Sequence, residues 1–129
     1  MSTTRSSVDT FSIIIGAFLL IEGIWGLFSD VVFGVLATNL THAVIHIALG
    51  IIAIWTGMSG RARGFIIFLG ALLLIVGVAW FIPGLSDIVV SLFNVNQAVA
   101  ILNIVVGIVS LIVAFTARNR PVGHDPVVP

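Results

Sequence analysis

Apolar residues occur in four long runs separated by short polar segments, over residues 11–28, 40–57, 65–81 and 97–117. A helix needs about 17–25 mostly apolar residues to cross the hydrocarbon core of a bilayer. Backbone amides in contact with lipid must be paired within their own segment, which favours helices for runs of this length. The pattern therefore predicts four transmembrane helices, and their modest lengths predict only weak tilts.

Two shorter apolar segments follow the first and third runs, at residues 29–36 and 86–93. Each opens with Ser-Asp, and such a pair before an apolar stretch is a helix-start signal. Both segments are too short to span a bilayer and too apolar to be fully solvated. We expect two short helices that lie along the membrane interface. The alternative is that a neighbouring span continues for two further turns.

The composition agrees with a membrane protein and excludes several soluble classes. Of 129 residues, 60% are hydrophobic and 8% are charged, and the mean hydropathy is +1.30. Soluble domains carry about 25% charged residues, so this chain cannot cover a water-exposed surface. A nucleic-acid partner would require a basic face, which is missing. Since the chain has no cysteine, disulfide scaffolds, thiolate metal sites and cysteine catalysis are excluded.

The basic residues indicate how the spans are oriented. All five are arginines that flank the same ends of the four runs: Arg5, Arg61, Arg63, Arg118 and Arg120. Basic residues are enriched in cytoplasmic segments, so both termini are expected in the cytoplasm. We expect residues 1–10 to be a cytoplasmic segment and residues 121–129 to be a disordered cytoplasmic tail. A cleaved signal peptide is disfavoured because the first run contains Glu22 and no small-x-small cleavage site follows it.

The two halves of the chain resemble each other. Residues 16–23 match residues 70–77 at six of eight positions, and further along Ser29-Asp30 aligns with Ser86-Asp87 and Arg61-x-Arg with Arg118-x-Arg. The sequence therefore predicts a tandem parallel repeat of two helices. Repeat one covers residues 11–64 and repeat two covers residues 65–120. Together they predict a single transmembrane domain, residues 11–117, folded as an up-down-up-down four-helix bundle.

Three polar residues are expected at a similar depth inside the bundle: Glu22, His46 and Asn103. His46 and Asn103 occupy equivalent repeat positions, whereas Glu22 aligns with Val76. Ionisable residues within a membrane are rare and are functional-site candidates by default. Desolvation penalises an isolated carboxylate, so Glu22 is expected to be protonated or paired with His46. The three residues form either a structural polar layer or a site for a ligand, ion or proton.

Small residues recur at helical spacing in the four runs, which is typical of closely packed membrane helices. The predicted helix-packing glycines are Gly16, Gly23, Gly50, Gly57, Gly70, Gly77 and Gly107.

His42 and His46 lie four residues apart, so both face the same side of a helix. Two imidazoles at this spacing can bind one metal ion, with Glu22 as a third ligand. Short motifs of this kind are weakly specific, and two histidines of one helix cannot occupy opposite axial positions of a haem. His42 is also expected near the membrane surface, where water could solvate it. No metal, haem or other cofactor is therefore expected.

The stretch from Asn39 to Gly50, Asn-Leu-Thr-His-Ala-Val-Ile-His-Ile-Ala-Leu-Gly, carries a family resemblance. It resembles the opening of the second helix in a family of small bacterial four-helix integral membrane proteins of unknown function. A weaker copy runs from Asn96 to Gly107, with Asn103 where some members have histidine. The resemblance implies a multi-pass protein of the bacterial plasma membrane. It implies no activity and no catalytic residue.

Three classes of function are compatible with the sequence. The favoured hypothesis is a non-enzymatic helical bundle with a structural, assembly or accessory role, whose partners are lipid and either further copies or another membrane protein. The alternative is a small proton- or ion-coupled transporter that uses Glu22 and His46. An enzyme is the least favoured class, because no nucleophile, phosphate-binding or dinucleotide-binding motif occurs.

Overall fold

The computed structural model describes residues 6–116. Within this part of the chain, the backbone forms five helices and one two-stranded antiparallel hairpin. In chain order, the elements are α1 (Ser7–Gly26), β1 (Val31–Val32), β2 (Leu36–Ala37), α2 (Leu40–Met58), α3 (Ala62–Trp80), α4 (Leu85–Phe93) and α5 (Gln97–Thr116).

Four helices of the described region, α1, α2, α3 and α5, are long and apolar enough to cross a membrane, as the sequence predicts. They contain 19 or 20 residues each, which corresponds to about 30 Å of helix. Two of them begin earlier than the apolar pattern indicates. The Ser6 hydroxyl caps α1 by accepting from the Asp9 amide, and the Asp9 carboxylate accepts from the amide of Ala62 at the start of α3.

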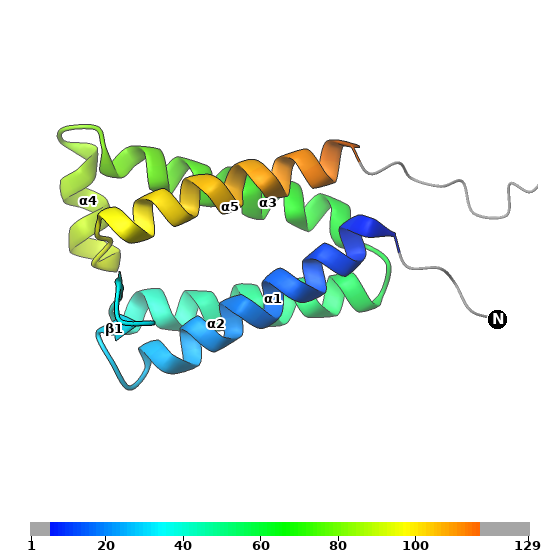
Figure 1. Ribbon diagram of the computed structural model, residues 1–129, viewed down its shortest axis with the longest axis horizontal. Helices are drawn as coiled ribbons and strands as arrows, with labels where there is room; N and C mark the ends of the chain where they lie inside the picture. Colours follow the sequence, from blue (N-terminus) through cyan, green and yellow to red (C-terminus); the bar gives the residue numbers. More distant parts are fainter. Residues whose placement is uncertain (1–5, 117–129) are drawn as a thin grey trace, which may run out of the picture.

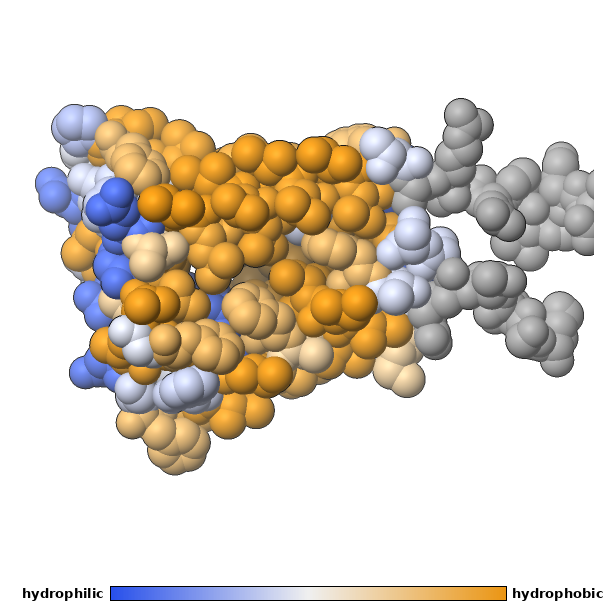
Figure 2. Space-filling model, viewed as in Figure 1, coloured by the Kyte–Doolittle hydropathy of each residue, from blue (hydrophilic) through white to orange (hydrophobic). Residues whose placement is uncertain are grey.

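The long helices form two pairs, α1 with α2 and α3 with α5 (Figure 1). The start of α1 and the end of α5 lie at one end of the molecule, here called the inner end. The hairpin and α4 lie at the opposite, outer end (Figure 1). We call α1, the hairpin and α2 the first half, and α3, α4 and α5 the second half. On the face shown in Figure 2, apolar side chains cover most of the middle of the molecule, and the strongly hydrophilic residues visible there lie at the outer end.

Each helix pair is held by a contact between two glycines. A Cβ atom built on Gly16 of α1 would lie 2.8 Å from the carbonyl oxygen of Gly50 in α2. A Cβ on Gly50 would lie equally close to the oxygen of Gly16. Gly70 and Gly107 make the same reciprocal contact between α3 and α5, at 3.0 and 2.8 Å. Since any side chain would clash with backbone here, the two helices of each pair approach as closely as backbones allow.

The other glycines expected in helix packing also face neighbouring backbones. A Cβ on Gly23 would lie 2.8 Å from the carbonyl oxygen of Ala43, and one on Gly77 would lie 2.7 Å from that of Ala100. A Cβ on Gly57 would lie 2.7 Å from the carbonyl oxygen of Asp9. These contacts extend the tight packing along most of each helix pair.

The first outer connection is not a helix, so the expectation for residues 29–36 is wrong. It is a hairpin in which Val31 pairs with Ala37 and Val32 pairs with Leu36. Its turn residues, Phe33 and Gly34, have φ values of 54° and 75°. Positive φ at both central positions is the requirement of a type I′ hairpin turn, and glycine adopts it without strain. The second half has Ser91 where the first has Gly34, which removes this turn signal.

The second outer connection is the expected short helix, α4. It is not an extension of a span, because α3 ends at Trp80 and a turn separates the two helices. At its other end, Asn94 adopts a left-handed conformation (φ 54°, ψ 41°) and terminates α4 before α5 begins. Asparagine tolerates this conformation better than most residues.

The glycine contacts can be tested with one substitution and a matched control. We expect Gly50→Ala to lower the free energy of unfolding by about 1–3 kcal/mol, because the new methyl group meets the Gly16 backbone. Gly64→Ala is the control, since Gly64 of α3 is exposed and its added Cβ would meet nothing within 4 Å. There, the better helix propensity of alanine is expected to maintain or raise stability.

The measurement is thermal loss of helical circular dichroism for protein in a mild detergent. A Gly50→Ala variant as stable as Gly64→Ala would contradict the proposed packing.

Candidate functional site

Glu22 and His46 meet inside the first half of the molecule. The Glu22 Oε1 atom lies 3.5 Å from the His46 Nδ1 atom, and both side chains are buried. Because α1 and α2 are in backbone contact one to two turns further inward, these two side chains have little freedom to separate. A charge-assisted hydrogen bond is usually shorter, about 2.7–2.9 Å, so the contact leaves hydrogen-bonding capacity on both groups.

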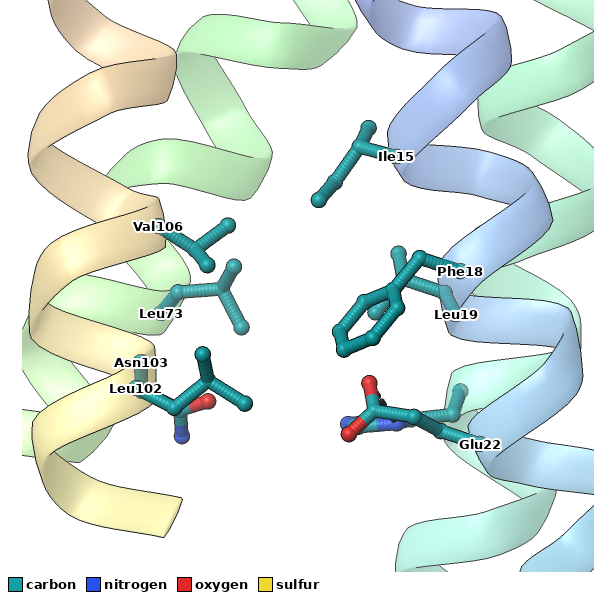
Figure 3. Close-up of a pocket in the computed structure, with 9 residues that line it drawn as sticks. Ile15, Phe18, Leu19, Glu22, Leu73, Leu102, Asn103 and Val106 are labelled. Carbon is teal, nitrogen blue, oxygen red and sulfur yellow. Dashed lines mark ion pairs between the residues drawn. The ribbon is translucent and has the colours of Figure 1, made fainter. Parts of the chain in front are cut away.

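Asn103 of α5 reaches the same place from the second half. Its side chain and that of Glu22 point into one small cavity from opposite sides (Figure 3). The residue is 6% exposed, and within residues 6–116 its amide group makes no hydrogen bond. The structure thus places all three residues of the expected polar layer around one cavity. The rest of its lining is apolar: Ile15, Phe18, Leu19, Leu73, Leu102 and Val106.

His42 lies one helical turn from His46, toward the outer end. Their rings meet edge to face, with centroids 4.3 Å apart. The His42 Nδ1–H group donates to the carbonyl oxygen of Phe93 at 3.1 Å, so this ring nitrogen carries the hydrogen. His42 is only 7% exposed, so its ring is buried rather than at the water-exposed surface expected from the sequence. Its ring lines a second cavity, together with Glu22, His46 and Thr38.

The geometry does not assemble the three metal ligands considered for the sequence. Glu22 and His46 are in contact, but in the described residues no three His, Asp or Glu side chains come close enough together to hold a metal ion. The nitrogen of His42 that faces Phe93 is engaged with a carbonyl group. The three side chains are arranged as a chain of polar contacts rather than as a coordination shell.

At the outer end, four side chains donate hydrogen bonds to backbone carbonyl groups of the opposite half. Asn39 Nδ2 donates to Leu92 at 3.0 Å, and Asn96 Nδ2 donates to Val35 at 3.0 Å. We call this set the outer bridge; its donors are Asn39, His42, Asn94 and Asn96.

The outer bridge also fixes where α2 and α5 begin. The Asn39 Oδ1 atom accepts from the backbone amide of His42, and the Asn96 Oδ1 atom accepts from that of Val99. Each asparagine therefore uses its oxygen to cap its own helix and its nitrogen to bind the other half. This double use places the start of α2, and with it His42 and His46, at a fixed position relative to α5.

Asp9 is a buried residue that the sequence pattern does not mark as a candidate site residue. Its carboxylate accepts from the Ser6 hydroxyl at 2.7 Å and from the Ala62 amide at 3.1 Å. It joins the start of α1 to the start of α3 at the inner end, with 6% of its surface exposed. The Ser6-x-x-Asp9 spacing is a capping signal. The sequence around residue 9 does not predict the hydrogen bond between Asp9 and the Ala62 amide.

The arginines used to predict orientation are only partly within the described residues. Arg61 and Arg63 lie at the inner end around the start of α3, the first exposed and the second half-buried. Arg5, Arg118 and Arg120 lie outside the described residues, as does the expected disordered tail.

Comparison with known proteins adds no further assignment. No family model matches the chain, and no curated protein or solved structure is detectably similar to it.

The double role of the bridge asparagines can be tested with paired substitutions. Asn39→Ala removes the cap and the bond to Leu92, so we expect a loss of about 1.5–3 kcal/mol of stability. Asn39→Ser keeps a capping oxygen but cannot reach Leu92, and about 1 kcal/mol is expected to be lost. The same order is expected for Ala and Ser at Asn96, which makes the equivalent bonds.

Stability would be read from denaturant unfolding in mixed micelles, followed by helical circular dichroism. If Asn39→Ser matched the wild type, the bond to Leu92 would contribute nothing.

Proposed function

We propose that this chain is a multi-pass protein of the bacterial plasma membrane that works as a non-enzymatic helical bundle, with a structural, assembly or accessory role. The four apolar helices of the described region support the membrane placement. The grouping of all arginines at the same ends of the spans supports an up-down-up-down topology with both termini in the cytoplasm. In this orientation, the hairpin and α4 face away from the cytoplasm.

The proposal includes a tandem repeat as the origin of the bundle. The Gly16–Gly50 contact of the first half recurs as the Gly70–Gly107 contact of the second. The outer bridge is reciprocal in the same way. Asn39 and Asn96 are 57 positions apart, and so are the two residues whose carbonyl groups they bind, Val35 and Leu92. A pseudo-twofold axis along the membrane normal accounts for both correspondences.

The observation that carries the structural role is the use made of polar side chains. At the outer end, Asn39, Asn94 and Asn96 bind backbone of the opposite half. At the inner end, Asp9 joins α1 to α3. These groups hold helices together, which is the expected use of polar residues in a bundle whose surface is occupied by lipid. The resemblance of residues 39–50 to small bacterial four-helix membrane proteins supports the membrane placement alone, because that family has no assigned activity.

We expect the bundle to act as a homo-oligomer or with another membrane protein. The number of chains can be measured by native mass spectrometry of membrane discs extracted without detergent. A defined assembly of two or more chains is the expected result. A monomer with no associated protein would contradict an assembly or accessory role.

A second candidate function is a small proton- or ion-coupled transporter. The observation that favours it is the position of the Glu22–His46 pair, which lines both small cavities. A carboxyl group within a membrane protein can bind and release protons when water reaches it.

A proton-flux measurement on Glu22→Gln separates the two candidates. The protein is placed in vesicles with an imposed pH gradient and an internal pH-sensitive dye. A structural bundle is expected to leave the gradient as stable as in protein-free vesicles, and Glu22→Gln to leave the helical content and the oligomeric size unchanged. A transporter would dissipate the gradient, and Glu22→Gln would abolish that flux.

Asp87→Asn is the matched control, since it removes one carboxylate from the exposed surface of α4. Flux that is lost in Glu22→Gln and retained in Asp87→Asn would overturn the structural proposal in favour of transport.

A further inference from the structure

The two small cavities beside the Glu22–His46 pair are partly open and are neighbours that share a wall. Glu22 and His46 line both of them. The inner cavity continues toward Leu73 and Val106, and the outer cavity continues toward the hairpin. Each has a volume of about 10 Å³, which is about the space that one water molecule requires.

Each cavity also offers the polar partners that a water molecule needs. Buried waters make about two to four hydrogen bonds to protein groups. The inner cavity presents Glu22, His46 and the unpaired amide of Asn103. The outer cavity presents Glu22, His46, His42 and Thr38. Since the direct Glu22–His46 contact is long, at 3.5 Å, each group retains capacity to bind a further donor or acceptor.

The surroundings of the cavities differ between the two ends of the molecule. Toward the inner end, the lining is apolar, with Ile15, Leu19 and Leu73, and an apolar core cluster continues beyond it. Toward the outer end, the outer cavity adjoins the hairpin and the outer bridge. The bridge consists of single hydrogen bonds between the two halves, which can break one at a time. The helix pairs cannot open as easily, because their glycine backbones are in contact.

We propose that the two cavities are single-water sites reached from the outer face only, and that the outer bridge is the closure that controls access to them. Water would pass the bridge, contact His42, His46 and Glu22, and end at Asn103. The inference uses the membrane orientation of the proposed function, with the hairpin and α4 away from the cytoplasm. It does not depend on whether the bundle is structural or transports protons.

Silver ion is a suitable probe of this route, because it is small and reacts with a thiol (R–SH + Ag⁺ → R–S–Ag + H⁺). The chain has no cysteine, so one introduced thiol reports one position. Val99→Cys places a thiol at the outer cavity and Val106→Cys places one at the inner cavity. Val113→Cys is the matched control. Val113 lies two turns from Val106 on the same face of α5 and packs against the apolar core cluster that contains Leu19 and Leu73. It lines neither cavity.

The protein would be placed in vesicles with the hairpin outward, as judged by protease protection of a tag added at the N-terminus. External Ag⁺ is applied for increasing times, and the remaining thiol is counted by alkylation after unfolding. We expect Val99→Cys to react fastest, Val106→Cys more slowly, and Val113→Cys no faster than background. If Val99→Cys fails to fold, Thr38→Cys places a thiol on the other wall of the outer cavity.

Two results would overturn the inference. Cavity thiols that react no faster than Val113→Cys would show that water does not reach the polar layer of Glu22, His46 and Asn103. A Val106→Cys thiol that reacts faster with Ag⁺ enclosed in the vesicle than with external Ag⁺ would show access from the inner end. Neither result would alter the flux measurement that tests the proposed function, so the two proposals fail separately.

The role of the bridge has its own test in the Val99→Cys background. Adding Asn39→Ser, which retains the helix cap, is expected to raise the Ag⁺ reaction rate about fivefold, the effect of losing one hydrogen bond from the closed state. Asn96→Ser is expected to do the same, because it breaks the equivalent bond. Unchanged rates in both variants would exclude the bridge as the closure.

Discussion

The contact between glycine backbones within each helix pair is the constraint on which the rest of this structure depends. Gly16 against Gly50, and Gly70 against Gly107, bring helix axes so close that no side chain fits between them. Between lipid-exposed helices there is little hydrophobic driving force, so packing of this kind has to stabilise association. The result is two tightly paired units, which leaves the interface between them as the place where polar groups and cavities can occur.

The interface between the two halves is held by polar contacts at its ends and contains the polar layer in between. Asp9 joins the halves at the inner end, and Asn39 and Asn96 join them at the outer end. Glu22 and His46 lie between apolar clusters, with Asn103 facing them. A bundle that needed only mechanical stability could fill this space with aliphatic side chains at lower cost, since buried ionisable groups are costly to desolvate. The Glu22–His46 pair therefore lowers its own cost by contact within the pair, with Asn103 facing it across the cavity.

The sequence was most informative where structure follows from local pattern. Apolar runs predicted all four long helices, because a segment of that length has few other ways to pair its backbone in lipid. The similarity of the halves misled the prediction of the first outer connection. Ser29-Asp30 and Ser86-Asp87 look alike, yet Gly34 permits a tight hairpin turn, whereas its counterpart Ser91 lies within a helix. Glycine adopts positive φ without the strain that most other residues incur, so Gly34 favours a turn that its counterpart Ser91 does not.

The four apolar spans and the candidate polar residues could be predicted from the chain alone, since each depends on composition or on helical spacing. Tertiary structure decided which of these residues meet. That Glu22 contacts His46, that His42 is buried against Phe93, and that Asp9 caps α3 are contacts between segments far apart in the chain. Such contacts depend on how the helices are rotated and how far they slide against one another. The glycine backbones fix that register, and no local pattern encodes it.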